Sequence, residues 1–307
     1  MTQPIAFLNG KTLAAHEATI PIDDAGFVLG ATVTEQLRTF GGRLFRLDRH
    51  LERLAKSLDI CGLDPGLAHS DFGRIAQSLV EHNHPLLERG DDLGLCIFVT
   101  PGPYAALSAG RLGRPTVGLH TFPLAFGLWA ARYAEGVRLV VTPVEQVSPH
   151  CWPAEMKCRS RMHYYLADRQ AAAIERGARA LLLDAAGNVT ESSTANLVIY
   201  VPGQGLIAPP RGQVLPGVSL EVVIELARGL GIPYAERELR PADVAAAAEA
   251  YLTSTPNCLL PVTRFAGRGI GDGRPGPIFG QISAAWNELV GLDVAAQAVR
   301  FANREGG

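Results

Sequence analysis

Residues 180–201 read ALLLDAAGNVTESSTANLVIYV, and this stretch decides the class of the second half of the chain. Two apolar runs, 180–184 and 195–201, have the length and composition of β-strands. Residues 184–188 supply Asp, Gly and Asn, which favour a hairpin loop after the first run. The stretch therefore predicts two strands separated by a loop and a polar segment.

Outward from this stretch, strand and helix signals alternate from Gly136 to the end of the chain. Strands are predicted at 137–142, 180–184, 195–201, 233–237, 250–254 and 260–265, and helices at 161–176, 218–230 and 277–290. This alternation is typical of a mixed α/β unit.

The first half has a different pattern, which predicts a smaller α+β unit. Asn9-Gly10 between apolar flanks favours a hairpin over residues 7–13. Leucines at helical spacing predict an amphipathic helix within 45–60. A second helix is predicted at 71–81, and strands at 33–40, 94–100 and 115–121. We expect a small domain over 1–121, a linker over 122–132 and a larger domain over 133–307.

Composition excludes several classes of protein. A formal net charge of −2 over 307 residues leaves no basic stripe for nucleic acid and no polybasic segment for a membrane surface. The N-terminus lacks the apolar core of a signal peptide, and the five cysteines are scattered, so we expect a cytoplasmic protein. Cys151 and Cys158 lack paired zinc-ligand spacing, so no metal is expected.

Two segments are candidate anion sites. Residues 215–219, Leu-Pro-Gly-Val-Ser, open a predicted helix, where backbone N–H groups attract phosphate. An ordinary helix cap explains them equally well. Residues 253–256, Thr-Ser-Thr-Pro, place hydroxyls at the end of a strand, although a plain polar turn is the alternative.

The order of these motifs resembles a known family. The chain presents His50 and Arg53, then Lys157 with Ser160-Arg161, then the run 190–197, then Leu215-Pro216-Gly217, then 253–255. This series is similar to the class IV aminotransferases, which are pyridoxal 5'-phosphate (PLP) enzymes of fold type IV. The group includes branched-chain and D-amino-acid aminotransferases and aminodeoxychorismate lyase. The likeness spans about residues 7–290 and implies an α+β N-terminal domain and a pseudo-barrel-like α/β C-terminal domain.

The resemblance assigns roles to particular residues. Lys157, one of only three lysines, matches the catalytic residue that holds PLP as a Schiff base and moves the substrate proton. Glu191 matches the carboxylate that keeps the pyridine nitrogen protonated, with a turn-exposed glutamate as the alternative. Arg53, the backbone of Val218 and Ser219, and Thr255 match phosphate contacts. The alternative for Arg53 is an ion pair on the helix surface.

The substrate side departs from the family. Many members have a tyrosine five positions after the lysine, where this chain has Met162. Arg159, Arg161 and His163 are therefore candidates for bonding the cofactor phenolate oxygen, and Arg159 and Arg161 also for binding substrate. Surface arginines of a plain helix are the alternative. Arg38 is a candidate carboxylate clamp, although pairing with Glu35 explains it equally well.

We therefore expect a PLP-dependent aminotransferase that works between an amino acid and a 2-oxo acid, as a homodimer. Lyase chemistry at the same site, or PLP binding without turnover, are the competing hypotheses. The sequence does not select the substrate.

Overall fold

A computed structural model describes residues 3–110 and 113–303. Its contacts divide the chain into two compact units. Unit 1 is Met1–Leu124 with Met156–Ser160, and unit 2 is Ala125–Glu155 with Arg161–Gly307. The short return of 156–160 to unit 1 was not foreseen, because it depends on pairing with residues more than a hundred positions away.

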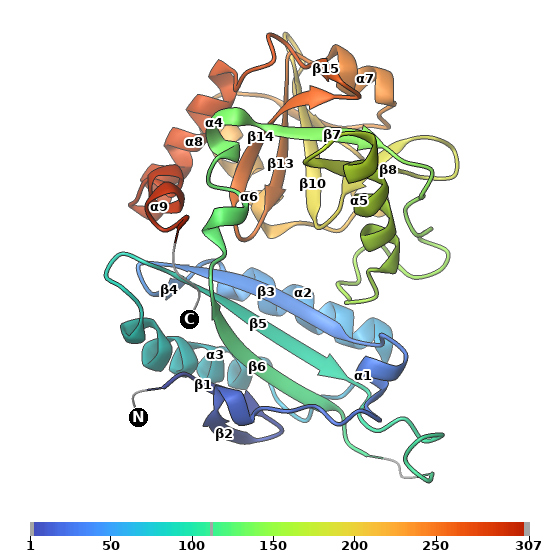
Figure 1. Cartoon of the computed structure of the whole chain (residues 1–307), viewed down its shortest axis with the longest axis vertical. Helices are drawn as coiled ribbons and strands as arrows, with labels where there is room; N and C mark the ends of the chain where they lie inside the picture. The colour runs from blue at the N-terminus through green and yellow to red at the C-terminus, as the bar shows by residue number, and fades with distance from the viewer. Residues whose placement is uncertain (1–2, 111–112, 304–307) are drawn as a thin grey trace. The chain divides into compact units, whose positions relative to one another are not determined.

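Unit 1 is an antiparallel sheet covered on one face by helices (Figure 1). The strand order is β2-β1-β6-β5-β3-β4. The strands are β1 (Ile5–Leu8), β2 (Lys11–Ala14), β3 (Val33–Phe40), β4 (Arg43–Leu44), β5 (Leu93–Thr100) and β6 (Thr116–Pro123). The helices are α1 (Ala25–Val28), α2 (Leu47–Cys61) and α3 (His69–Asn83).

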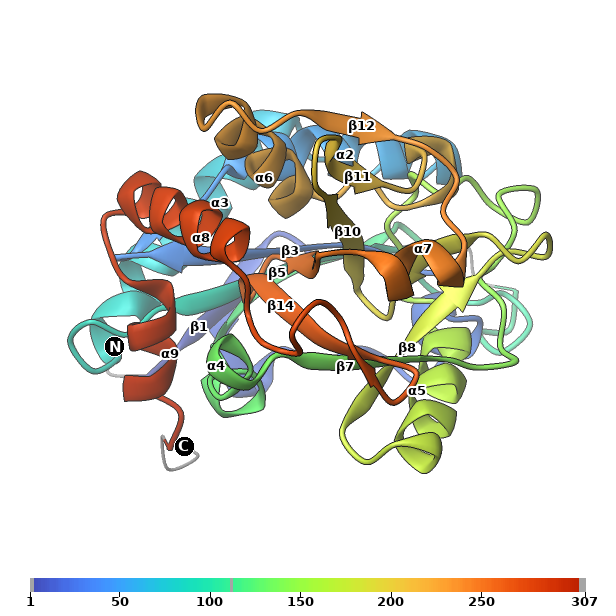
Figure 2. The ribbon, with the colours of Figure 1, turned by 90° about the horizontal axis from the view of Figure 1, so that it is seen from above.

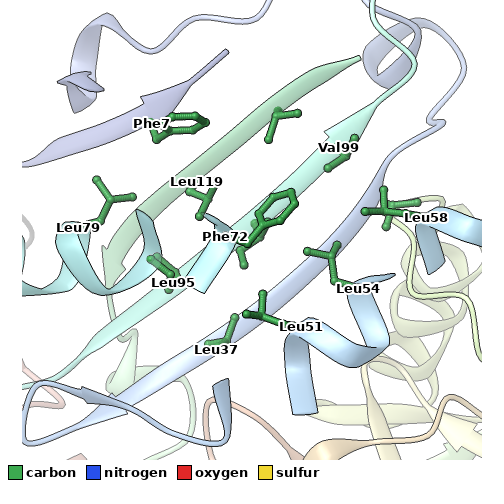
Figure 3. Packing of buried hydrophobic residues seen from close by; sticks show 14 of the residues in the cluster. Phe7, Leu37, Leu51, Leu54, Leu58, Phe72, Leu79, Leu95, Val99 and Leu119 are labelled. Atoms are coloured by element: carbon green, nitrogen blue, oxygen red, sulfur yellow. The ribbon is translucent and has the colours of Figure 1, made fainter. Parts of the chain in front are cut away.

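The core of unit 1 lies between this sheet and helices α2 and α3. Leu51, Leu54 and Leu58 of α2 belong to one buried cluster with Leu37 and Leu95 of the sheet, and Leu51 lies beside Leu37 (Figure 3). The predicted leucine periodicity thus packs as expected, and burying each leucine contributes about 1.5–3 kcal/mol. The predicted hairpin is confirmed as well, because Asn9 and Gly10 have φ angles of 49° and 85° between β1 and β2.

Unit 2 contains a sheet of mixed direction that closes on itself. The ring runs β9-β10-β13-β14-β7-β8 and returns to β9, because β9 pairs with both β8 and β10. These strands are β7 (Val137–Val141), β8 (Ala178–Leu183), β9 (Val189–Ser192), β10 (Ala195–Val201), β13 (Glu249–Ser254) and β14 (Cys258–Phe265). Strands β11 (Gly205–Ala208), β12 (Tyr234–Glu236) and β15 (Arg268–Gly269) extend it. The predicted pseudo-barrel is confirmed.

Helices surround this sheet. They are α4 (Arg132–Glu135), α5 (Met162–Ile174), α6 (Val218–Gly229), α7 (Pro241–Ala246), α8 (Pro277–Val290) and α9 (Val294–Arg300). Helices α6 and α8 pack against each other, and α5 packs on β7 and β8 (Figure 2). The predicted helices α5, α6 and α8 are confirmed, whereas the short elements β9, β11 and α9 were missed. These elements are so short that their hydrophobic periodicity cannot be recognised in the sequence.

Within the described residues, no helix has the length and hydropathy needed to cross a bilayer.

Candidate active site

Three polar residues of unit 2 lie in one row across neighbouring strands. Asn196 of β10 is paired in register with Glu191 of β9 on one side and with Thr253 of β13 on the other. Strands β10 and β13 are visible side by side in Figure 1. Residues directly opposite each other in antiparallel strands share a face of the sheet. The pairing thus brings together the polar run 190–197 and the 253–256 segment.

Glu191 is a buried carboxylate held in a defined orientation. Glu191 is only 5 % exposed and lies within strand β9. The alternative of a turn-exposed glutamate is therefore wrong. The Tyr164 hydroxyl and the Gln146 amide each donate to its Oε1 at 2.7 Å. Asn196 Nδ2 reaches its Oε2 at 3.4 Å. Burial and the Glu191 charge raise the pKa of Tyr164 far above its ordinary value, so this phenol stays protonated and donates.

Asn196 also fixes the start of helix α6. Its Nδ2 donates to the Leu215 carbonyl at 2.8 Å, and a Cβ at Gly217 would overlap its Oδ1. Gly217 is the N-cap residue, so Val218 and Ser219 open the helix and present the N–H groups of its first turn. Both are buried. The helix start and Glu191 are therefore tied to the same asparagine.

The second predicted anion segment follows β13. The Thr253 hydroxyl is buried and has no hydrogen-bond partner among the described residues. Ser254 donates to the Asn257 side chain at 2.9 Å, and Thr255 lies half-buried in the turn to β14. A buried hydroxyl without a partner is uncommon, and it leaves this side chain able to bond a polar ligand.

Lys157 lies in unit 1, on the segment that pairs with the start of β3. Its carbonyl accepts from Thr34 N at 3.0 Å, and its own N–H donates to Ser57 Oγ of α2 at 3.1 Å. Val33 and Cys158 form an isolated antiparallel bridge. The backbone on both sides of Lys157 is thus fixed.

Arg53 lies one helical turn before Ser57 and is buried. Its Nε and Nη2 donate to the two oxygens of Glu35, at 2.7 and 2.9 Å, and His50 Nδ1 lies 2.8 Å from the same carboxylate. The alternative of a helix-surface ion pair is therefore wrong in its location, because Arg53 and Glu35 are both buried. A phosphate role for Arg53 stays a prediction.

The charges in this triad shift its pKa values. Burial alone would raise the pKa of Glu35, but the charge and hydrogen bonds of Arg53, with those of His50, hold it well below 4.5. Burial lowers the pKa of His50 below 6.5 against the opposing pull of Glu35, and the charges of Arg53 and Lys157 add to the lowering. His50 is thus neutral and Glu35 charged at neutral pH.

The remaining arginine candidates are divided between the units. Arg38 is 1 % exposed in β3, where its Nε donates to the Thr39 carbonyl at 3.2 Å and its guanidinium lies 4.1 Å from the Phe40 ring centroid. Arg38 is three positions after Glu35 in the same strand, and side chains alternate between the two faces, so Arg38 and Glu35 point to opposite faces of the sheet. Arg159 is in unit 1, and Arg161 is the N-cap residue of α5 in unit 2.

The predicted residues are divided between the two units. Unit 2 contains Glu191, Val218, Ser219, Thr255 and Arg161, and unit 1 contains Lys157, Arg53, Arg38 and Arg159. Sequence reasoning missed Tyr164 and Gln146, which lie 27 and 45 positions from Glu191. Tyr164 lies in the predicted helix 161–176, two residues after Met162, which occupies the family's tyrosine position. A tyrosine so close to that position was the signal that could have identified it.

Comparison with known proteins gives a consistent result. The family model "Amino-transferase class IV" matches residues 32–265. A D-alanine aminotransferase from Bacillus licheniformis is 29 % identical over 280 residues, covering 90 % of this chain and 94 % of that protein. A putative branched-chain-amino-acid aminotransferase from Methanocaldococcus jannaschii is 26 % identical over 286 residues, covering 92 % and 95 %.

Solved structures show the same fold. The branched-chain aminotransferase of Thermoproteus uzoniensis with norvaline superposes with a TM-score of 0.81 at 26 % identity, covering 94 % of this chain and 95 % of that one. The T.th. branched-chain amino acid aminotransferase complexed with N-(5'-phosphopyridoxyl)-L-glutamate gives a TM-score of 0.83 at 22 % identity and the same coverage.

Proposed function

This chain belongs to the amino-transferase class IV family, and we propose that it transfers an amino group between an amino acid and a 2-oxo acid using PLP bound through Lys157. The observation that carries the proposal is the buried carboxylate of Glu191, which Tyr164 and Gln146 orient and which Asn196 ties to the start of α6. A stable barrel does not need a buried acid at this place. An enzyme that must hold a proton on a ring nitrogen does.

The residues of unit 2 fit the chemical groups of PLP. Glu191 supplies the anion for the pyridine nitrogen, and Val218 and Ser219 supply helix N-terminal N–H groups for the phosphate. The partnerless Thr253 hydroxyl and the neighbouring Thr255 add donors beside them. From unit 1, Lys157 supplies the amine and Arg53 a further cation for the phosphate.

When bound, PLP supplies an electron sink that stabilises negative charge at the substrate α-carbon. The residues of the chain carry out the rest. The Lys157 amine takes the proton from the α-carbon and delivers it to the cofactor carbon that carries the transferred nitrogen. Gln146 and Tyr164 donate to Oε1 of Glu191 and orient the carboxylate, which would keep the proton on the ring nitrogen. Tyr164 remains a phenol and donates throughout.

Arg38 and Arg161 stay proposals as substrate-binding residues. Arg38 is nearly inaccessible at 1 % exposure, which makes it the weaker of the two. Arg161 precedes helix α5, which also carries Tyr164.

We further propose a cytoplasmic homodimer. Segment 20–29 of unit 1 exposes Ile22 by 85 %, Phe27 by 75 % and Leu29 by 57 %, a concentration of apolar surface typical of an interface. All five cysteines are thiols rather than disulfides, which supports a reducing compartment. Sedimentation should give twice the chain mass of 32.7 kDa, and a fully active monomer would contradict the proposal.

The function is tested with the purified protein. We expect PLP to give a visible absorption band that borohydride bleaches, with the reduced label on Lys157 in peptide mapping. Adding an amino donor without an acceptor should convert the band to the pyridoxamine form, and adding a 2-oxo acid should restore it. A band that does not respond to any amino donor, or a label on another residue, would overturn the proposal. Loss of a leaving group without a stable pyridoxamine form would indicate lyase chemistry instead.

A further inference from the structure

The face of the unit 1 sheet that turns away from α2 and α3 carries an ordered row of aromatic rings. Phe98 pairs with Gly118, and Phe122 with Gly94, in the antiparallel register of β5 and β6. A Cβ on either glycine would overlap the ring of its phenylalanine partner, so each ring lies flat over the neighbouring strand. The His120 ring stands between them, 6.4 Å from Phe98 and 6.0 Å from Phe122. The two glycines thus fix this surface.

Arg159 reaches the same face. Its Nη2 lies 2.7 Å from Cys96 Sγ, its Nε lies 3.4 Å from Thr34 Oγ1, and its guanidinium carbon lies 5.9 Å from the centre of the Phe98 ring. Cys96 is directly opposite His120 in the sheet register. Burial acts to raise the pKa of the Cys96 thiol, but hydrogen bonding by His120 and the charge of Arg159 bring it below its ordinary value. Arg159 and His120 therefore converge on one point.

The guanidinium of Arg159 has no carboxylate within 4.0 Å among residues 3–110 and 113–303. Asp24 lines the same cavity, but its carboxylate already accepts from Gly26 N at 2.7 Å, Thr100 at 3.0 Å and Thr116 at 2.6 Å. An arginine that neutral groups hold in place, without an anionic partner, is suited to an anionic ligand, because its planar fork matches a carboxylate.

A cavity of about 650 Å³ opens beside the side chains of Arg159 and His120, and all of its lining residues belong to unit 1. Its walls include Arg159, His120 and Phe98 at one part and the apolar side chains of Leu8, Ile20 and Phe27 at another. This volume is typical of small-molecule sites, which are mostly apolar with a few polar groups that fix orientation. The cavity suits a ligand with an anionic end and an apolar body.

The path of the chain relates this cavity to Lys157. Thr34 N donates to the Lys157 carbonyl and Arg159 N donates to the Thr32 carbonyl, so 157–159 runs as an extended segment beside β3. Val33 and Cys158 are the opposed pair and share the face of the helices. Because side chains alternate along an extended segment, the Cα–Cβ bonds of Lys157 and Arg159 both leave it on the opposite side.

We propose that Arg159 and His120 hold the carboxylate of the amino-acid substrate, and that the adjoining cavity selects amino acids with one carboxylate and a large apolar side chain. The inference rests on the proposed function and adds a substrate class to it. Arg159 supplies the charge and the paired N–H donors, and His120 supplies a ring N–H. Thr34 and Cys96 position the guanidinium.

The test compares leucine with isopentylamine, which has the same skeleton without the carboxylate, in the single-turnover conversion of the PLP form to the pyridoxamine form. We expect Arg159→Ala to lower the second-order rate constant for leucine by roughly ten- to a hundredfold, the range for hydrogen bonds to a charged group. The rate with isopentylamine should change less than about threefold. Arg159→Lys should restore part of the loss, since it keeps the charge and loses the fork. Arg74→Ala, an exposed arginine of α3, is the control and should match the parent protein.

His120→Asn provides a second variant in case Arg159→Ala does not fold, and it should also lower the leucine rate and spare isopentylamine. The visible band and the borohydride label on Lys157 report on the proposed function separately, because these variants leave Lys157 and Glu191 in place. Equal losses for leucine and isopentylamine, or no loss for leucine in either variant, would overturn the carboxylate assignment. Faster conversion with glutamate than with leucine in the parent protein would overturn the substrate class.

Discussion

The hydroxyl of Tyr164 on α5 donates to Oε1 of Glu191 on β9 over 2.7 Å. This hydrogen bond joins a helix to a strand, and the two residues are 27 positions apart in the sequence. The phenol cannot ionise near neutral pH, because burial and the carboxylate charge both raise its pKa. The Tyr164 phenol therefore donates to the Glu191 carboxylate throughout the neutral pH range.

Tyr164→Phe deletes that donor and leaves the ring. A hydrogen bond to a charged group contributes about 1.5–3 kcal/mol, so we expect the amino-donor half-reaction to slow by roughly ten- to a hundredfold. Stopped-flow absorbance at saturating PLP measures it. The control is Tyr165→Phe, the next residue, which is 60 % exposed. Equal rates in the two variants would show that Tyr164 does not act through Glu191.

Glu191→Gln keeps the shape of the side chain and removes its charge. The amide can still bond the ring nitrogen but cannot hold a proton there, so the half-reaction should slow by more than about a hundredfold, equivalent to roughly 2.7 kcal/mol. Most of the PLP should remain bound. Single-turnover rate and PLP occupancy are measured on one sample. A wild-type rate at full occupancy would require another acid in this role.

Lys157→Ala removes the amine that the proposal gives to PLP and to the substrate proton. We expect weak, non-covalent PLP binding and a rate lower by several orders of magnitude. Mass spectrometry after borohydride treatment should then find no PLP attached to the protein. Attachment in this variant would contradict the assignment, since Lys11 and Lys56 would be the remaining amines of the side chains.

Gly217→Ala tests the close approach of Asn196 to the start of α6. The new Cβ would displace Asn196 Oδ1 and weaken its hydrogen bond to the Leu215 carbonyl, which contributes about 0.5–1.5 kcal/mol. We expect PLP affinity to fall by up to about tenfold, as measured by equilibrium dialysis. Gly212→Ala is the matched control, because nothing lies within 4 Å of a Cβ there. Identical PLP affinities in the two variants would show that the contact between Asn196 and the start of α6 does not contribute to phosphate binding.

Acid should destabilise unit 1 in two stages. The folded state lowers the pKa of His50 below 6.5, so the unfolded chain binds more protons and stability falls as pH drops through 6.5. Glu35 has its pKa lowered from 4.5, so its contribution is complete above 4.5 and is lost progressively below it. Urea titrations from pH 8 to 3.5 measure both stages. In Glu35→Gln the lower stage should become smaller, while Glu52→Gln, an exposed residue of α2, should retain it in full. Flat stability from pH 7 to 4 in the parent protein would contradict both shifts.

Much of the fold was predictable because its signals are local. The leucine spacing of α2, the Asn9-Gly10 turn and the alternation of elements after Gly136 each depend on residues within a few positions of one another. The short strand β9 was missed because its polar composition, Val-Thr-Glu-Ser, hides a fully buried strand. Its burial arises from closure of the barrel, which no local pattern reports.

The sequence by itself indicated the candidate chemistry through its resemblance to the family, which rests on the ordered motifs around Lys157, Glu191 and the Leu215-Pro216-Gly217 turn. Only the tertiary structure decided which groups act on those residues. It paired Arg53 with Glu35, placed Tyr164 on Glu191 and brought Arg159 beside Cys96, across separations of 18, 27 and 63 residues. Periodicity specifies which side of an element is buried. The partner of a buried polar group is set by packing, because a charge or hydroxyl withdrawn from water is stable only where the fold supplies its counterpart.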